Sequence, residues 1–137
     1  NTGNPAIFGF EAPYQIVRDM IEAIPHAHGY SDSRGIMSAR RAVVSRYEEI
    51  TGFPKFDPDD VYLGNGVSEL ITMTMQALLD TGDEVLIPSP DYPLWTAGVS
   101  LSGGTPVHYI CDEEAGWMPD IDDMRRKITP NTRCATS

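Results

Sequence analysis

Two glycines and a serine stand where an apolar run gives way to a helical pattern, and this arrangement could bind a phosphate. Residues 61–63 (Val-Tyr-Leu) indicate a short strand, and Gly64, Gly66 and Ser68 lead into a helix predicted over residues 67–79. Glycine lets the backbone turn sharply and approach a ligand closely, and the first turn of a helix leaves unpaired N–H groups. The Ser68 hydroxyl could cap this helix or bond a phosphate oxygen.

The two commonest nucleotide motifs fit this stretch badly. A P-loop needs Gly-Lys followed by Ser or Thr, and no lysine lies between Lys55 and Lys127. The dinucleotide motif needs a third glycine where Glu69 stands. A nucleotide is therefore disfavoured. From these residues alone, a phosphate site and a purely structural turn remain equally open.

The other residues that could do chemistry fit structural roles better. His26 and His28 stand two positions apart in a turn without a nearby carboxylate or cysteine, which disfavours a metal pair. His108 alternates with apolar neighbours, as a structural strand residue does. Cys111 and Cys134 show no metal-ligand spacing, and we interpret them as free thiols.

Predicted helices and strands alternate along the chain, which indicates an α/β fold. The helices are expected over residues 13–23, 39–50, 67–79, 93–102 and 121–128, and the strands over residues 61–63, 84–87 and 106–110. Asp120 is the expected N-cap of the last helix, and Ser38 is that of the helix over residues 39–50. The inward face of that second helix is expected to comprise Ala39, Ala42, Val43, Tyr47 and Ile50.

The strand over residues 61–63, the helix that follows it and the strand over residues 84–87 are separated by short links. This pattern predicts a βαβ unit with parallel strands and a right-handed crossover. Ligands of such sheets bind at the carboxyl ends of the strands. Residues 64–68 and 89–93 both lie at those ends, so Tyr92 is expected on the same rim as the phosphate candidate.

Composition limits the classes of partner. The chain of 137 residues carries a net charge of -10, which argues against nucleic acid or an anionic membrane surface as a partner. No apolar run reaches the length of a membrane span, and no signal segment precedes the first predicted helix. A cytoplasmic protein is expected. Because the chain begins at Asn1 without methionine, we expect it to be part of a longer product.

Four separated motifs stand out along the chain, which are Asn1-Thr2-Gly3-Asn4-Pro5, Gly29-Tyr30-Ser31-Asp32-Ser33-Arg34-Gly35, Gly64-Asn65-Gly66-Val67-Ser68-Glu69 and Pro90-Asp91-Tyr92-Pro93. In order and spacing they resemble motifs of the class I/II aminotransferases, which are pyridoxal-phosphate enzymes of fold type I. The similarity spans Asn1 to Arg133 and is strongest to the bacterial alanine (glutamate–pyruvate) aminotransferases.

The resemblance implies a role for each motif. The loop matching Gly66, Val67 and Ser68 would hold the phosphate of pyridoxal 5'-phosphate, and Tyr92 would stack on the pyridine ring. Tyr30 would reach the phosphate in the neighbouring subunit, which implies a homodimer. Gly3 would lie against the substrate, an L-amino acid or a 2-oxo acid.

The resemblance also implies that catalytic groups lie outside this chain. An aminotransferase needs a lysine that holds the cofactor as a Schiff base, a carboxylate at the pyridine nitrogen and an arginine for the substrate carboxylate. Neither Lys55 nor Lys127 matches the lysine of the family, so no catalytic residue is assigned here. After Arg133 the family continues with an apolar strand and an Asn-Pro motif, from which residues 134–137 depart.

We therefore expect an incomplete N-terminal part of a fold type I pyridoxal-phosphate-dependent transferase, with a mainly parallel sheet flanked by helices. Residues 1–30 would form a substrate-side loop and linker helix, and residues 31–137 an incomplete cofactor-binding large domain. Another fold type I protein, either a lyase or a regulator domain, is an alternative. A phosphate-binding module without catalysis is another.

Overall fold

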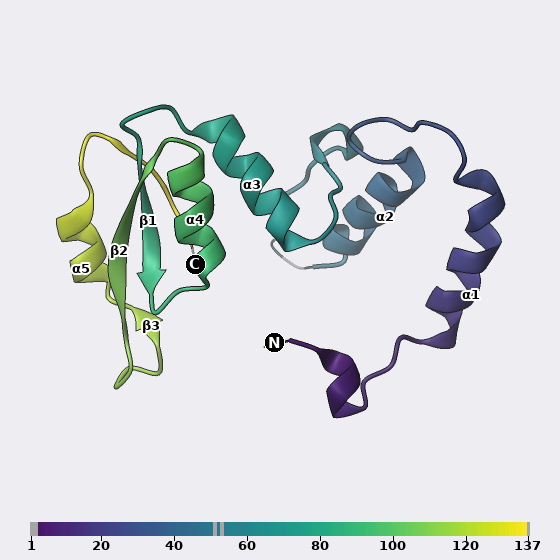
Figure 1. Ribbon diagram of the computed structural model, residues 1–137, viewed down its shortest axis with the longest axis horizontal. Coiled ribbons are helices and arrows are strands. Elements are labelled where there is room, and N and C mark those ends of the chain that lie inside the picture. Colours follow the sequence, from purple (N-terminus) through teal and green to yellow (C-terminus); the bar gives the residue numbers. More distant parts are fainter. Residues whose placement is uncertain (1–2, 51, 53, 137) are drawn as a thin grey trace.

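The computed structural model describes residues 3–50, 52 and 54–136. Figure 1 shows α1 at one end, a four-stranded sheet with α4 and α5 at the other, and α3 between the sheet and α2. The helical elements are η1 (Pro5–Phe8), α1 (Tyr14–Ala23), η2 (Ile24–His26), α2 (Met37–Glu48), η3 (Pro58–Asp60), α3 (Val67–Leu78), α4 (Pro93–Leu101) and α5 (Ile121–Lys127). The strands are β1 (Glu84–Ser89), β2 (Thr105–Asp112), β3 (Met118–Pro119) and β4 (Thr132–Ala135).

The sheet has the strand order β3-β2-β1-β4. β1 pairs in parallel with β2 and with β4, and only the short β3 runs antiparallel, against β2. Parallel strands need a crossover, and α4 supplies it between β1 and β2. The expected α/β fold with a mainly parallel, helix-flanked sheet is confirmed, and α3, α4 and α5 lie within one or two residues of their predicted bounds.

The core lies between α3, α4 and one face of the sheet. Because side chains alternate along a strand, Val85 and Ile87 of β1 point to this same face. The buried cluster comprises Ile71, Met75 and Leu79 of the α3 segment, Val85, Ile87, and Val99 of α4. α3 and α4 pack together at Gly98, where a built Cβ would lie 3.4 Å from the Cγ2 of Ile71, an ordinary van der Waals distance.

The helix α5 is fixed to the other side of the sheet by a buried carboxylate (Figure 1). Asp120 caps α5 as predicted, and its side chain accepts hydrogen bonds from two backbone N–H groups in the first turn. Asp123 is buried and accepts from the Ile110 N–H at 3.0 Å and from Lys127 Nζ at 2.7 Å. The hydrogen bond from Lys127 is the main reason that the pKa of Asp123 lies below its ordinary value.

The N-terminal segment packs against little else in the described part of the chain. No hydrogen bond or ion pair among the described residues joins residues 3–30 to the remainder. The apolar stripe of α1 is exposed and comprises Ile16, Val17, Met20, Ile21 and Ile24 at the end of the helix. The expected division at residue 30 stays a prediction.

None of the helices in the described residues is long and apolar enough to span a membrane.

The predicted strand over residues 61–63 is wrong. This segment is irregular, because its backbone groups bond to nearby loops and not to a neighbouring strand. The Val61 N–H donates to the Pro58 carbonyl oxygen, and the Leu63 N–H donates to the carbonyl oxygen of Arg34. The βαβ unit of the described chain therefore comprises β1, α4 and β2, and it does not include residues 61–63.

Two details of α2 also differ from the prediction. The helix begins at Met37 with Ile36 as its N-cap, so Ser38 lies within the first turn and does not cap it. Its buried residues are Arg40 and Val44, whereas Ala42, Tyr47 and Ile50 of the predicted inward face are exposed. An arginine faces inward because polar acceptors surround its guanidinium, as described below.

The core predicts unequal effects for two methionines on α3. Met75 is 2% exposed and Met73 is 41% exposed. In the full-length protein that contains this chain, Met75→Ala should lower the free energy of unfolding by about 2–5 kcal/mol, because it leaves a cavity between α3, β1 and α4. Met73→Ala should change it by less than about 0.5 kcal/mol. Urea unfolding measures both values, and equal losses would contradict the described packing of α3.

Candidate functional site

The N-terminus of α3 is open and has no side-chain cap. Its N-cap is Gly66, which has a φ of 82° and therefore a left-handed backbone conformation that favours glycine. Among the described residues, no hydrogen bond uses the N–H groups of Val67, Ser68 or Glu69. These donors and the positive end of the helix dipole can bind an anion. The alternative in which Ser68 caps the helix is not realised.

The loop before α3 leaves its backbone accessible. A Cβ on Gly66 would meet no atom within 4 Å, so a ligand can approach the backbone at that residue. Gly64 is crowded, because a Cβ there would lie 2.9 Å from Glu69 Oε2 and 2.9 Å from Leu70 Cδ2. The Glu69 carboxylate accepts a hydrogen bond from the Asn65 N–H and so folds back over the loop. Gly64 therefore lets the loop close, and Gly66 leaves room for a ligand.

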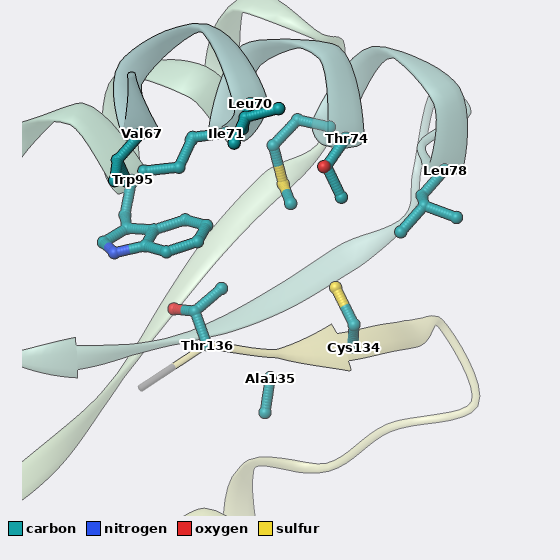
Figure 2. A pocket seen from close by; sticks show the side chains of 10 residues that line it. Val67, Leu70, Ile71, Thr74, Leu78, Trp95, Cys134, Ala135 and Thr136 are labelled. Carbon is teal, nitrogen blue, oxygen red and sulfur yellow. The ribbon is translucent and has the colours of Figure 1, made fainter. Parts of the chain in front are cut away.

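The start of α3 faces the same side of the molecule as the carboxyl end of β1. In Figure 1 the end of β1 and the starts of α3 and α4 face the lower side of the view. An open apolar pocket of about 470 Å³ is lined by residues that include Val67 of α3, Trp95 of α4 and Thr136 just after β4. Figure 2 shows Val67 and Trp95 at the same end of this pocket. The position of residues 64–68 on the ligand-binding edge of the sheet stays a prediction.

Tyr92 is the N-cap residue of α4, three residues after β1 ends, and its side chain is 63% exposed. The neighbouring Asp91 fixes this turn, because the Thr96 hydroxyl donates to Asp91 Oδ2 at 2.9 Å. The same hydroxyl lies 2.9 Å from Nε2 of His108 on β2. Hydrogen bonds thus hold the backbone at this turn while the tyrosine ring stays free for stacking.

Tyr30 and Gly3 are not brought to the start of α3 by hydrogen bonds or ion pairs among the described residues. Tyr30 is fully exposed in the coil between η2 and α2. Gly3 is exposed in a turn before η1, with a φ of 89° and open space around it. Their assigned roles toward a neighbouring subunit and a substrate stay predictions.

Neither lysine is shown at the start of α3. Lys127 Nζ donates to Asp123 Oδ2 and to the His108 carbonyl oxygen, both at 2.7 Å, on the side of the sheet that α5 covers. Lys55 is exposed in the irregular segment before η3. In the described structure the start of α3 thus offers backbone donors and a serine hydroxyl, which suit a phosphate better than a metal ion.

The sequence reading missed one residue of this region, which is Arg40. It is 1% exposed, and its guanidinium donates to the carbonyl oxygens of Gly35 and Pro58. The sequence signal for its burial is its position four residues before Val44, because residues four apart lie on the same face of a helix. Arginine is normally assigned to solvent, and only the position of the surrounding acceptors shows that this one is buried.

Comparison with known proteins gives a family. A family model described as aminotransferase class I and II matches residues 4–135. The chain is 74% identical to an alanine aminotransferase of Mycobacterium tuberculosis over 133 residues, which are 97% of this chain and 31% of the relative. It is 58% identical to a glutamate–pyruvate aminotransferase of Escherichia coli, over 97% of this chain and 33% of that protein. The chain thus spans about a third of the length of these relatives.

Solved structures agree with this result. An Escherichia coli aminotransferase matches with a TM-score of 0.92 and 57% identity, covering 97% of this chain and 33% of that one. An alanine aminotransferase from Pyrococcus furiosus matches with a TM-score of 0.90 and 41% identity, covering 97% and 34%. The fold type I architecture implied by the four motifs is confirmed. The chain belongs to the class I and II aminotransferases.

Proposed function

We propose that the full-length protein containing this chain is a pyridoxal-phosphate-dependent aminotransferase. It exchanges an amino group between an L-amino acid, alanine or glutamate, and a 2-oxo acid. The structural observation that carries the proposal is the uncapped, glycine-bounded start of α3, which faces the same side of the molecule as the carboxyl end of β1 (Figure 1). The named relatives are alanine and glutamate–pyruvate aminotransferases, which supports the substrate class and argues against a lyase, a regulator or a non-catalytic module.

In this proposal the residues of the chain bind and orient the cofactor. The N–H groups of Val67 and Ser68, together with the Ser68 hydroxyl, bind the phosphate, and Gly66 lets the phosphate approach the backbone. The exposed ring of Tyr92 stacks on the pyridine ring. Bound pyridoxal phosphate supplies the electron sink for the bond changes at the substrate Cα. Gly3 leaves room for the substrate beside the cofactor.

The remaining groups come from other parts of the protein. We propose that the catalytic lysine, the carboxylate at the pyridine nitrogen and the substrate-binding arginine lie outside residues 1–137, because Lys127 is engaged by Asp123 and Lys55 lies apart from the start of α3 in sequence. We further propose a homodimer in which Tyr30 hydrogen-bonds the phosphate bound by the partner subunit. Full exposure of Tyr30 within its own chain supports this role. A cytoplasmic location remains a prediction.

The activity is tested by an assay of the full-length protein with L-alanine and 2-oxoglutarate, in which pyruvate formation is measured.

The role of Tyr92 is tested in the same protein, where Tyr92→Ala should weaken cofactor binding and slow turnover more than Tyr92→Phe. Aromatic contacts contribute about 0.5–1.5 kcal/mol beyond burial, so stacking alone predicts roughly a 2- to 13-fold loss. If the two variants lose the same amount, the hydroxyl and not the ring is the important group.

The in-trans role of Tyr30 is tested by mixing two full-length variants. Tyr30→Ala removes the hydroxyl, and Ser68→Asp places a carboxylate where it repels the phosphate. Each homodimer should be impaired. A mixed dimer has one intact site, in which the phosphate-binding residues of the Tyr30→Ala subunit are completed by Tyr30 of its partner. Subunit exchange should therefore restore activity well above that of either variant alone.

Unmixed variants carried through the same exchange procedure are the control. No recovery on mixing would mean that Tyr30 serves its own subunit. An unimpaired Tyr30→Ala homodimer would mean that Tyr30 is a turn residue without a role in cofactor binding.

A further inference from the structure

A buried arginine on α2 connects two loops of the cofactor region. Arg40 is 1% exposed and donates to four acceptors. Its guanidinium lies 3.0 Å from the Gly35 carbonyl oxygen and 2.9 Å from that of Pro58. It also lies 3.2 Å from Asp59 Oδ1 and 3.3 Å from Asp32 Oδ2. A rigid, planar guanidinium with five N–H donors can hold several acceptors at fixed positions, which a single ammonium cannot.

A second arginine, Arg34, binds two of the acceptors that Arg40 binds. Arg34 contacts the same two carboxylates, at 3.2 Å from Asp32 Oδ2 and 3.1 Å from Asp59 Oδ1. Its hydrogen bonds to Asp32 hold the pKa of that carboxyl below its ordinary value. We call these four residues, Asp32, Arg34, Arg40 and Asp59, the arginine clamp.

The clamp joins residues 31–35 to η3. The Leu63 N–H donates to the Arg34 carbonyl oxygen at 2.9 Å, which extends this contact toward residues 64–68. The two segments are closely packed at Gly35, where a Cβ would lie 2.6 Å from Leu63 Cδ1. The contacts at Asp32, Arg34 and Gly35 thus fix the segment that follows Tyr30.

Tyr30 itself makes no hydrogen bond or ion pair among the described residues and is fully exposed. Its position must therefore be set by the backbone next to it, and Asp32, two residues later, is the nearest residue held by the clamp. A loop that is ordered before binding loses less conformational entropy when it captures a ligand.

We propose that Arg40 is a positioning residue for cofactor binding. Through the arginine clamp it holds residues 31–35 so that Tyr30 is presented to the phosphate of the partner subunit. This inference rests on the proposed function, because it takes the in-trans role of Tyr30 as its starting point. It adds that a residue buried in one subunit determines the cofactor affinity of the other.

The first test is the dissociation constant of pyridoxal phosphate, measured by equilibrium dialysis with the full-length protein. Tyr30→Phe should weaken binding roughly 10- to 100-fold through loss of a charge-assisted hydrogen bond. Arg40→Met should weaken it by at least about tenfold, and Arg40→Lys by less. In a Tyr30→Phe background, Arg40→Met should add less than about twofold. Arg41→Met, a change at the exposed neighbouring arginine, is the control and should leave the dissociation constant unchanged.

The mixed dimers separate positioning from general folding. In one arrangement Arg40→Met is placed in the Ser68→Asp subunit, whose Tyr30 completes the intact site of the mixed dimer. There it should abolish the recovered activity. The same change in the Tyr30→Ala subunit should leave the recovery intact, because the loop of that subunit serves a site that is already defective. Equal loss in both arrangements would indicate a structural role and overturn the inference. If Arg40→Met does not fold, Arg40→Lys is used in both arrangements, with a smaller loss expected in the Ser68→Asp subunit and again none in the Tyr30→Ala subunit.

The outcomes distinguish the two proposals. If Tyr30→Phe leaves cofactor affinity unchanged, the in-trans role of Tyr30 is wrong and the inference for Arg40 is overturned with it. If Tyr30→Phe weakens binding but Arg40→Met acts additively with it, the role of Tyr30 stands and only the inference for Arg40 is overturned.

Discussion

The packing of α3 against β1 and α4 is the contact on which the candidate site depends. Ile71 and Met75 bury the inner face of the helix against Val85 and Val99. This apolar contact fixes the direction of α3, so its open N-terminus faces the same side as the carboxyl end of β1 (Figure 1). A helix start in that position leaves donors for an anion without any positively charged side chain in its first turn.

The sequence predicted the elements in which local signals agree with the final packing. α3, α4 and α5 show a helical period between glycine, proline and capping residues, and their observed bounds follow those signals. Residues 61–63 carry strand-forming side chains, but a strand also needs a neighbouring strand. Within the described chain their N–H groups bond to loops instead. Strand propensity alone cannot show whether a partner strand is present.

The burial of Arg40 could not be predicted from sequence, because it depends on acceptors from two segments that only the fold brings together. The carbonyl oxygens of Gly35 and Pro58 and the carboxylates of Asp32 and Asp59 compensate for removing the guanidinium from water. Residue patterns did predict a phosphate candidate at residues 64–68, since glycines and a helix start are local features. The roles of Tyr30 and Gly3 depend on a partner subunit and a substrate, so only family resemblance suggested them.

The central claim is that the start of α3 binds the phosphate of the cofactor. The most direct test compares the affinity of the full-length protein for pyridoxal phosphate and for pyridoxal, which lacks the phosphate, in the wild type and in Ser68→Asp. The account predicts that Ser68→Asp weakens binding of pyridoxal phosphate and leaves binding of pyridoxal nearly unchanged, because the new carboxylate repels only the phosphate. An equal loss of affinity for both ligands would contradict it.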